Sequence, residues 1–351
     1  MSEEQLSAAA VGQGAETDAD VVIDHPRRRW RGPWRHRIAV LAVVIVVLAV
    51  AMFLLLRSCQ PPGPNGFRVI AVGDSACQPD DPNFNNGSGQ NGWCYGKAVS
   101  DLALTKNPQM VWGLGDYQYE VPTLDYYVNV FAKEWGRLSK ITEPAVGNQE
   151  YKVQDARPYV AYFLDKTRSE HNFFYSYDIG SWHMIVLNSN CTIVAGGCGP
   201  DSPQVKWLQE DLAANHSRCI AAYWHHPRWS TGINGSDNRV GFFAQELVKA
   251  KADIMLSGHE ADYERFPPLD AAGNPSPDGV RQFVVGTGGQ VMYTPVRNPG
   301  AKPRKEPAKE ASNFTTSGFL ELTLYQDHYD FDYRTVDDTI TDSGSTACHQ
   351  R

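Results

Sequence analysis

Short apolar runs alternate along the chain with segments whose apolar residues recur at helical spacing. Runs with the length of buried strands occupy residues 68–72, 110–114, 173–177, 183–188, 220–224, 254–256 and 282–285. Segments with the character of amphipathic helices occupy residues 95–104, 123–138, 202–215 and 242–252. A final stretch, 319–333, alternates apolar and polar positions. Because strands first alternate with helices and then dominate, we expect an α/β sandwich with mixed sheets.

The longest apolar stretch lies near the N-terminus, at residues 38–56, and contains no polar residue. A helix of this length nearly spans a hydrocarbon core of about 30 Å. A buried core helix is one alternative, but such a helix would carry a polar face. A cleaved signal peptide is the other, but its apolar region is usually only about 7–15 residues long and a small-residue cleavage site follows it. We therefore expect an uncleaved transmembrane helix.

The charges that flank this stretch predict its orientation. Six arginines lie between residues 27 and 37, whereas Arg57 alone follows the stretch closely. The positive-inside rule then places segment 1–37, which is polar, basic and expected to be disordered, in the cytoplasm. A Pro/Gly-rich linker at 57–66 leads to a domain at 67–351 outside the cytoplasm. The protein is thus expected to be a single-pass protein of the cell membrane.

The cysteines agree with this orientation, since all seven lie at position 59 or later. Disulfides form and persist outside the cytoplasm. The candidate pairs are Cys191 with Cys198, Cys77 with Cys94, and Cys219 with Cys348, the last of which would tether the C-terminus. The sequence alone leaves this pairing open, and Cys59 has no evident partner.

Composition narrows the class of ligand. The formal net charge is −8, and an acidic surface repels a nucleic-acid backbone, so we expect no nucleic-acid partner. With 42% hydrophobic and 21% charged residues, the rest of the chain can bury a core.

Polar residues of metal-ligand type stand at the ends of five apolar segments: Asp74, Asp116, Asn148, His225 and His259. Functional sites in α/β sheets collect at the carboxyl ends of strands. Glycine precedes four of the five and is expected to let the backbone turn there. Each residue alone has an ordinary structural explanation, but their joint occurrence in order favours a site. Carboxylate, amide oxygen and imidazole together suit one or two ions of Fe, Mn or Zn.

The segments around these residues resemble a known family. They read GD at 73–74, GDYQY at 115–119, GNQE at 147–150, AYWH at 222–225 and GHEADYER at 258–265. This order is similar to that of the calcineurin-like metallophosphoesterases, most of all the purple acid phosphatase-like branch. The resemblance covers residues 67–335 and implies a four-layer α/β/β/α sandwich that binds metal and hydrolyses phosphate esters. It implies phosphorylated small molecules or polymers as substrates, whereas protein partners stay unknown.

The resemblance also assigns roles to residues. Asp116 would bridge two metals, Asp74 and Tyr119 would complete the first site, and Asn148, His225 and His259 the second. A tyrosine ligand implies a trivalent iron. His226 would contact phosphate or be a mere neighbour of the ligand His225.

Two positions depart from the family pattern. Gln149 stands where the family has a histidine that protonates the leaving group, and glutamine has no proton to give near neutral pH. Ala261 stands where a second histidine would bind the first metal; Glu260, Asp262 or water would have to replace it. Three hypotheses therefore remain: an active enzyme with a modified site, a binding module without turnover, and a domain without metal. We favour the first.

Overall fold

The computed structural model describes residues 66–164, 166, 173–293 and 306–351. The predicted segments 1–37 and 38–56, the linker up to residue 65 and Cys59 lie outside these ranges. No helix in the described ranges has the length and apolar character that a membrane crossing requires. The predicted transmembrane helix and domain boundaries therefore stay predictions.

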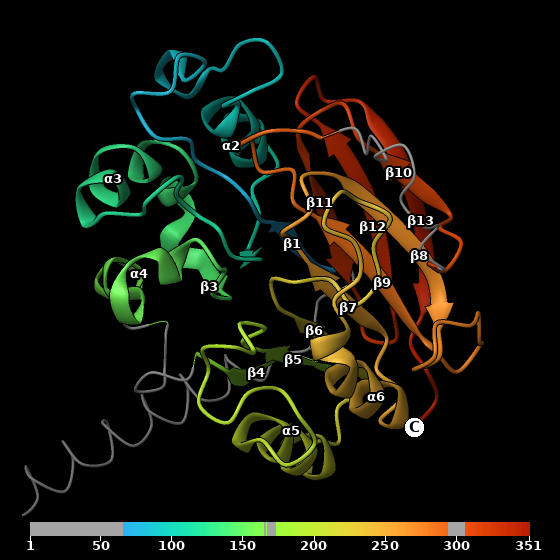
Figure 1. Ribbon diagram of the computed structural model, residues 1–351. Helices are drawn as coiled ribbons and strands as arrows, with labels where there is room; N and C mark the ends of the chain where they lie inside the picture. The colour runs from blue at the N-terminus through green and yellow to red at the C-terminus, as the bar shows by residue number, and fades with distance from the viewer. Residues whose placement is uncertain (1–65, 165, 167–172, 294–305) are drawn as a thin grey trace, which may run out of the picture. The chain divides into compact units, whose positions relative to one another are not determined.

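The first sheet joins the start of the described chain to its end. Its six strands lie in the order β13 (Ile340–Ala347), β12 (His328–Thr335), β11 (Gly318–Leu324), β1 (Phe67–Val72), β2 (Met110–Gly113) and β3 (Thr142–Pro144). The last three run parallel, whereas β11 pairs antiparallel with both β1 and β12. Because β1, β2 and β3 are parallel, they end at the same edge of the sheet; Figure 1 labels β1 and β3 below helix α2 (Gly96–Thr105).

The second sheet has a parallel centre flanked by antiparallel strands. Its order is β10 (Ala311–Asn313), β8 (Tyr263–Leu269), β9 (Val280–Val285), β7 (Ile254–Ser257), β6 (Cys219–Tyr223), β5 (Trp182–Val186) and β4 (Tyr175–Ile179). Strands β5, β6, β7 and β9 are parallel to their neighbours in this group. Both sheets are therefore mixed, as the sequence predicts.

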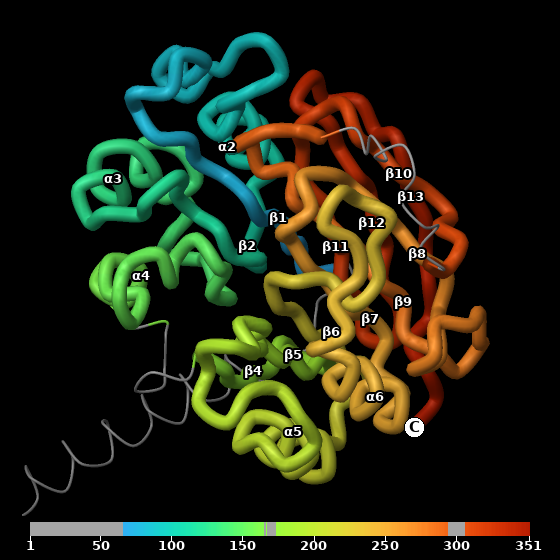
Figure 2. The backbone as a smooth tube through the Cα atoms, in the orientation of Figure 1, coloured from blue at the N-terminus to red at the C-terminus, as the bar shows by residue number. Residues whose placement is uncertain are grey.

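Three apolar cores define four layers. Strand β1 shows how: Val69 and Ala71 face a core shared by both sheets, whereas Ile70 and Val72 face a core that includes helices. That outer core contains side chains of α2 (Gly96–Thr105), α3 (Leu124–Asn129) and α4 (Arg157–Phe163). The other outer core packs α5 (Pro203–Ala214) and α6 (Gly241–Lys249) on the second sheet. Figure 2 shows these two groups of helices apart from each other, so the predicted α/β/β/α sandwich is confirmed.

The helix predicted over residues 123–138 is only partly correct. Thr123 caps α3, but the helix ends at Asn129 and gives way to 3₁₀ segments at Phe131–Lys133 and Trp135–Ile141. The chain leaves helical geometry at Glu134, whose φ and ψ are −108° and −115°. Glu134 is buried against Gly87 and Gly96, which have no room for a β-carbon there. Tertiary packing of this carboxyl group thus overrides the local helical pattern. The other 3₁₀ segments are Asn85–Gly87, Glu150–Lys152, Gln154–Ala156 and Asn238–Val240.

The strands β8 and β13 were not predicted from the sequence, and their side chains bind each other. Arg265 and the hydroxyl of Tyr263 on β8 both bind Asp342 of β13, so these two residues of the GHEADYER segment join the sheets. The short strand β10 was not predicted either. All three candidate disulfides form, and the pair Cys219–Cys348 ties the C-terminus to the start of β6.

Candidate metal centre

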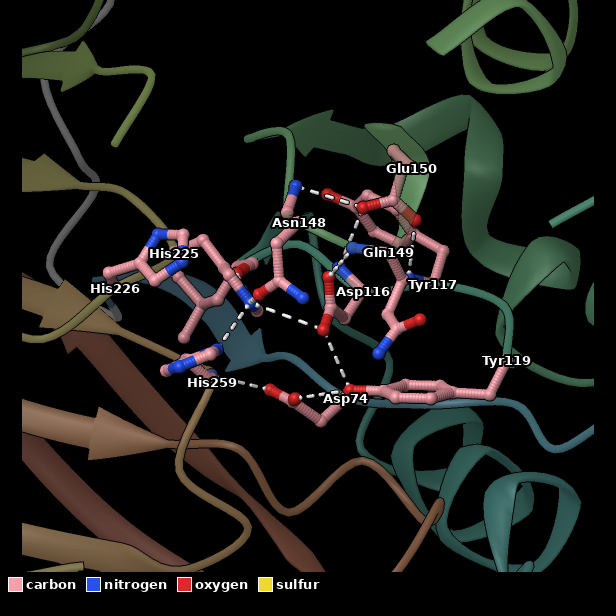
Figure 3. A network of polar contacts seen from close by, with 12 residues as sticks. Asp74, Asp116, Tyr117, Tyr119, Asn148, Gln149, Glu150, His225, His226 and His259 are labelled. Atoms are coloured by element: carbon pink, nitrogen blue, oxygen red, sulfur yellow. Dashed lines mark hydrogen bonds and ion pairs between the residues drawn. The ribbon is translucent and has the colours of Figure 1, made fainter. Parts of the chain in front are cut away.

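The candidate ligands come from adjoining edges of the two sheets. Asp74 and Asp116 follow β1 and β2, and Asn148 lies four residues beyond β3. His225 and His259 follow β6 and β7 of the second sheet. Figure 3 shows their side chains turned toward one another. The structure thus brings together the residues that the sequence analysis selected at strand ends, although their binding of metal stays a prediction.

The backbone turns at the ligands themselves more than at the glycines before them. Asp74, Asp116 and His259 have φ angles of 59°, 54° and 69°, in the left-handed region that side chains rarely adopt. Such conformations persist where the surrounding structure enforces them, commonly at functional sites. Gly115 alone among the preceding glycines shares a positive φ, of 90°. Gly147 is required for space rather than for its backbone angles, because a β-carbon there would collide with the Asp116 carboxylate.

Two buried carboxylates share one phenol. The hydroxyl of Tyr119 lies 2.7 Å from Asp74 Oδ1 and 2.8 Å from Asp116 Oδ2. The second oxygen of Asp74 accepts the backbone N–H of His259 at 2.8 Å. The predicted ligands of the first metal are therefore in contact, and a single O–H lies between two acceptors.

His225 contacts candidate ligands from both sheets. Its Nδ1 lies 2.8 Å from the carbonyl oxygen of Leu114, to which it donates, so Nε2 faces the site. Nε2 lies 3.0 Å from Asn148 Oδ1, 3.2 Å from Asp116 Oδ2 and 3.2 Å from His259 Nδ1. Metal-binding histidines commonly donate their other ring N–H to a carbonyl or carboxylate in this way.

Burial and the neighbouring charges set the protonation of these groups in the metal-free chain. Burial, helped by the charge of Asp116, raises the pKa of Asp74 to about 7. Burial opposes the charged form of Asp116 as well, but His225 outweighs it and the pKa of Asp116 is lowered. Against its own burial, His225 gains a pKa of about 9 from Asp116, whereas burial and His225 lower the pKa of His259 to about 4.

These residues fit a metal by their chemistry. Two carboxylates less than one-twentieth exposed, at 2% and 1%, need a nearby positive charge. In the described chain His225 and the bound protons provide it. Asp74, Asp116 and His225 offer ligand atoms within 4.8 Å of one another, and so do His225, His226 and His259. Oxygen and imidazole donors of this kind suit Fe, Mn or Zn.

Gln149 occupies the position that the family gives to a histidine. Its backbone N–H donates to Asp116 Oδ1 at 2.8 Å, which positions the bridging carboxylate. Its side-chain oxygen Oε1 is buried and has no hydrogen-bond partner in the described chain. The residue therefore lies beside the bridging carboxylate, and its side-chain oxygen is buried without a partner among the described residues.

The missing histidine at Ala261 is not replaced by Glu260. The carboxylate of Glu260 accepts the backbone N–H groups of Asn234 and Gly235, at 3.2 and 2.5 Å. Asp262 is nearly as buried, and its Oδ1 has no partner in the described residues. Burial and the charge of Glu264 raise the pKa of Asp262 far above its usual value, which favours a protonated group. Glu260 is bonded to backbone donors and Asp262 favours its protonated form, so neither acid takes the place of the missing histidine.

Glu150 is a residue of the site that sequence reasoning did not single out. Its carboxylate accepts the backbone N–H groups of Asp116, Tyr117 and Gly147, each at 2.9 Å. The hydroxyl of Tyr127 donates to it at 3.0 Å. Glu150 thus holds the loops after β2 and β3 together beneath the site. The signal was present in the GNQE segment, whose acid follows Asn148 by two residues.

Comparison with known proteins adds to this geometry. No family model matches the chain. Purple acid phosphatase 22 of Arabidopsis thaliana is 24% identical over 219 residues, which cover 55% of this chain and 47% of that protein. The purple acid phosphatase PPD1 from yellow lupin (Lupinus luteus) seeds superposes with a TM-score of 0.64 at 19% identity, over 82% of this chain and 55% of that one. A dimetal phosphatase from Danio rerio gives a TM-score of 0.56 at 12% identity, over 81% of this chain and all of that one.

The chain has the fold of the calcineurin-like metallophosphoesterases and is similar in sequence to purple acid phosphatases. The resemblance noted in the sequence is thereby confirmed. The chain spans about half of the length, 47%, of the curated relative it matches.

Metal binding at this centre should depend on pH. The folded-state pKa of Asp74 is raised to about 7, so its proton stabilises the metal-free fold at low pH and that contribution is lost as pH rises through 7. A metal must displace this proton. We expect the gain in melting temperature on adding Mn²⁺ or Zn²⁺ to grow between pH 5 and pH 8. Thermal unfolding checks this, and Asp74→Asn should flatten the dependence; an equal gain at both pH values would contradict it.

Proposed function

We propose that this chain is a metal-dependent phosphoesterase whose site lies where the two sheets adjoin. The observation that carries the proposal is the meeting of Asp116, Asn148 and His259 around Nε2 of His225, from four separate strand ends. Asp74 and Tyr119 lie next to them and extend the donor set toward a second ion. The sequence and structural relatives, which are named as phosphatases, support it.

The residues of the site can be assigned to two metal positions. When bound, a pair of ions would neutralise charge on the phosphoryl oxygens and lower the pKa of water. Asp116 would lie between the two ions, with Asp74 and Tyr119 on one side and Asn148, His225 and His259 on the other. His225 keeps one orientation because Leu114 accepts its Nδ1–H. The first position has fewer protein ligands, because Ala261 offers no donor, and should bind its metal more weakly.

We propose further that the phosphoesterase acts outside the cytoplasm from a membrane anchor at residues 38–56. The sequence supports this through the uninterrupted apolar stretch and the arginines before it. Three disulfides support an oxidising compartment. Its substrates would be phosphorylated small molecules or polymers of that compartment.

A module that binds metal or phosphate without turnover is the second candidate function. The alanine at 261 and the glutamine at 149 favour it, since one removes a ligand and the other a proton donor. Metal-dependent release of phosphate separates the two functions, because a module would bind metal and show none.

Metal content is the direct test. The purified protein should hold at least one transition-metal ion per chain, and the double variant His225→Ala plus His259→Ala should release it. His328→Ala serves as a matched control, because that histidine lies on β12 and contacts Asp327 at the surface. Elemental analysis that finds no transition metal in the wild-type protein after metal loading would contradict the proposed function.

A further inference from the structure

His226 lies inside the candidate centre but is not placed like its neighbours. Its ring centroid is 4.4 Å from that of His259 and 5.0 Å from that of His225. Only 7% of the residue is exposed. In the described chain its Nδ1 bonds to a serine, and its Nε2 has no hydrogen-bond partner. The free nitrogen can face a ligand either as a bare lone pair or as an N–H group, and these two states bind opposite kinds of partner.

Ser189 decides between the two states. It lies just beyond β5, next to β6, so it meets His226 at neighbouring strand ends. The Ser189 hydroxyl oxygen accepts the backbone N–H of His226 at 2.9 Å and lies 2.8 Å from the ring Nδ1. The serine is fully buried, and in the described chain its hydroxyl hydrogen has no other acceptor.

Counting donors and acceptors then fixes the proton. If Nδ1 carried the hydrogen, the Ser189 oxygen would accept two hydrogen bonds and its own O–H would be buried without a partner. An unmet buried donor costs about 1–3 kcal/mol. If Ser189 donates to Nδ1 instead, the buried hydroxyl is satisfied and the ring hydrogen lies on Nε2, which is not among the fully buried atoms without a partner and can therefore reach water or a ligand.

We propose that Ser189 holds His226 as its Nε2–H tautomer, so that His226 donates a hydrogen bond to a phosphoryl oxygen rather than binding metal. The inference rests on the proposed function, whose phosphate ligand it assigns to a specific donor. His226 is then the phosphate-binding residue and Ser189 its positioning residue. A neutral N–H of this kind needs no proton from solvent, and it lies at a site where Gln149 supplies an amide in place of a histidine.

The test uses the full-length protein loaded with zinc and titrated with inorganic phosphate by calorimetry. A hydrogen bond to a charged ligand corresponds to roughly a ten- to hundredfold change in affinity. We expect His226→Ala to weaken phosphate binding by about tenfold or more, without loss of zinc. His226→Gln, which restores an N–H at the same reach, should recover most of the affinity.

The Ser189 variants separate positioning from packing. Ser189→Ala should weaken phosphate binding in the same direction, whereas Ser189→Thr, which keeps the hydroxyl, should not. In protein labelled with ¹⁵N-histidine, the His226 signals should report the Nε2–H tautomer in the wild type and in Ser189→Thr, and a mixture in Ser189→Ala. For p-nitrophenyl phosphate, KM should rise more than kcat falls.

Two results would overturn the proposal. Loss of zinc in His226→Ala would make this residue a metal ligand, and an unchanged tautomer with unchanged phosphate affinity in Ser189→Ala would remove the role of the serine. Failure of the proposed function looks different. If the protein binds zinc and binds phosphate through His226 but releases no phosphate from esters, the proposed phosphoesterase function is contradicted and the assignment of His226 and Ser189 is kept.

Discussion

Replacing Asp116 with asparagine is expected to lower metal-dependent hydrolysis of p-nitrophenyl phosphate by roughly a thousandfold or more, the scale on which charge stabilisation in active sites operates. Asp116 contacts candidate ligands of both metal positions: its carboxylate lies against the hydroxyl of Tyr119 and Nε2 of His225, and it accepts the backbone N–H of Gln149. Asparagine has the same shape but carries no charge. The substitution would remove the negative charge that is expected to serve both metal positions, while the packing of the side chain stays the same.

The measurement is kcat/KM with saturating metal, together with metal content. Asp201→Asn is the matched control, because its side chain is 96% exposed and only a distant Lys206 neighbours it. This control should keep full activity. Activity within a few-fold of wild type in Asp116→Asn would show that hydrolysis does not depend on the centre, even if the protein still bound metal elsewhere.

The substitution Gln149→His is expected to raise activity, selectively for esters with poor leaving groups. General acid catalysis contributes about 10²–10⁴-fold, and glutamine cannot supply it. An aryl phosphate has a good leaving group and needs little help, whereas an alkyl phosphate needs a proton. We therefore expect wild type to cleave aryl phosphates far faster than alkyl phosphates, and the variant to narrow this gap by about a hundredfold.

The ratio of kcat/KM for the two substrate classes is the quantity to compare, since it cancels differences in protein concentration and metal loading. Gln149→Asn shortens the amide without adding a proton and is the control. An equal gain on both classes would point to better binding rather than proton donation. No gain on alkyl phosphates would mean that the leaving group is protonated by another group or by solvent.

The candidate ligands could be predicted because the fold places strand ends together. Asp74, Asp116 and His225 each follow an apolar run directly, and parallel strands bring such ends to one edge of a sheet. The three disulfides could be named as candidates although the sequence left their pairing open, and the structure confirms all three. The strand ends are marked by the residues next to them, so a single sequence reveals them.

Contacts between distant segments could not be predicted in this way. Ser189 meets His226 across 37 residues, and nothing in the serine's own neighbourhood marks it. Strand β13 carries few large apolar residues, and its pairing with β12 is what fixes it. The break in helical geometry at Glu134 depends on burial of this residue against glycines from other segments. The departures at positions 149 and 261 are visible in the sequence, but only the structure shows that Glu260 is already bonded elsewhere.

The order of the first sheet has a consequence for when the metal can be acquired. Strand β1, which ends at the first ligand, pairs on one side with β11, and β11 in turn with β12 and β13. Residues from Gly318 onward, which form β11, β12 and β13, therefore supply the strands beside which β1 lies. During synthesis these residues emerge long after β1, and pairings across so many residues are slow to form. Nascent chains should consequently stay unable to load metal until β11, β12 and β13 have emerged and paired.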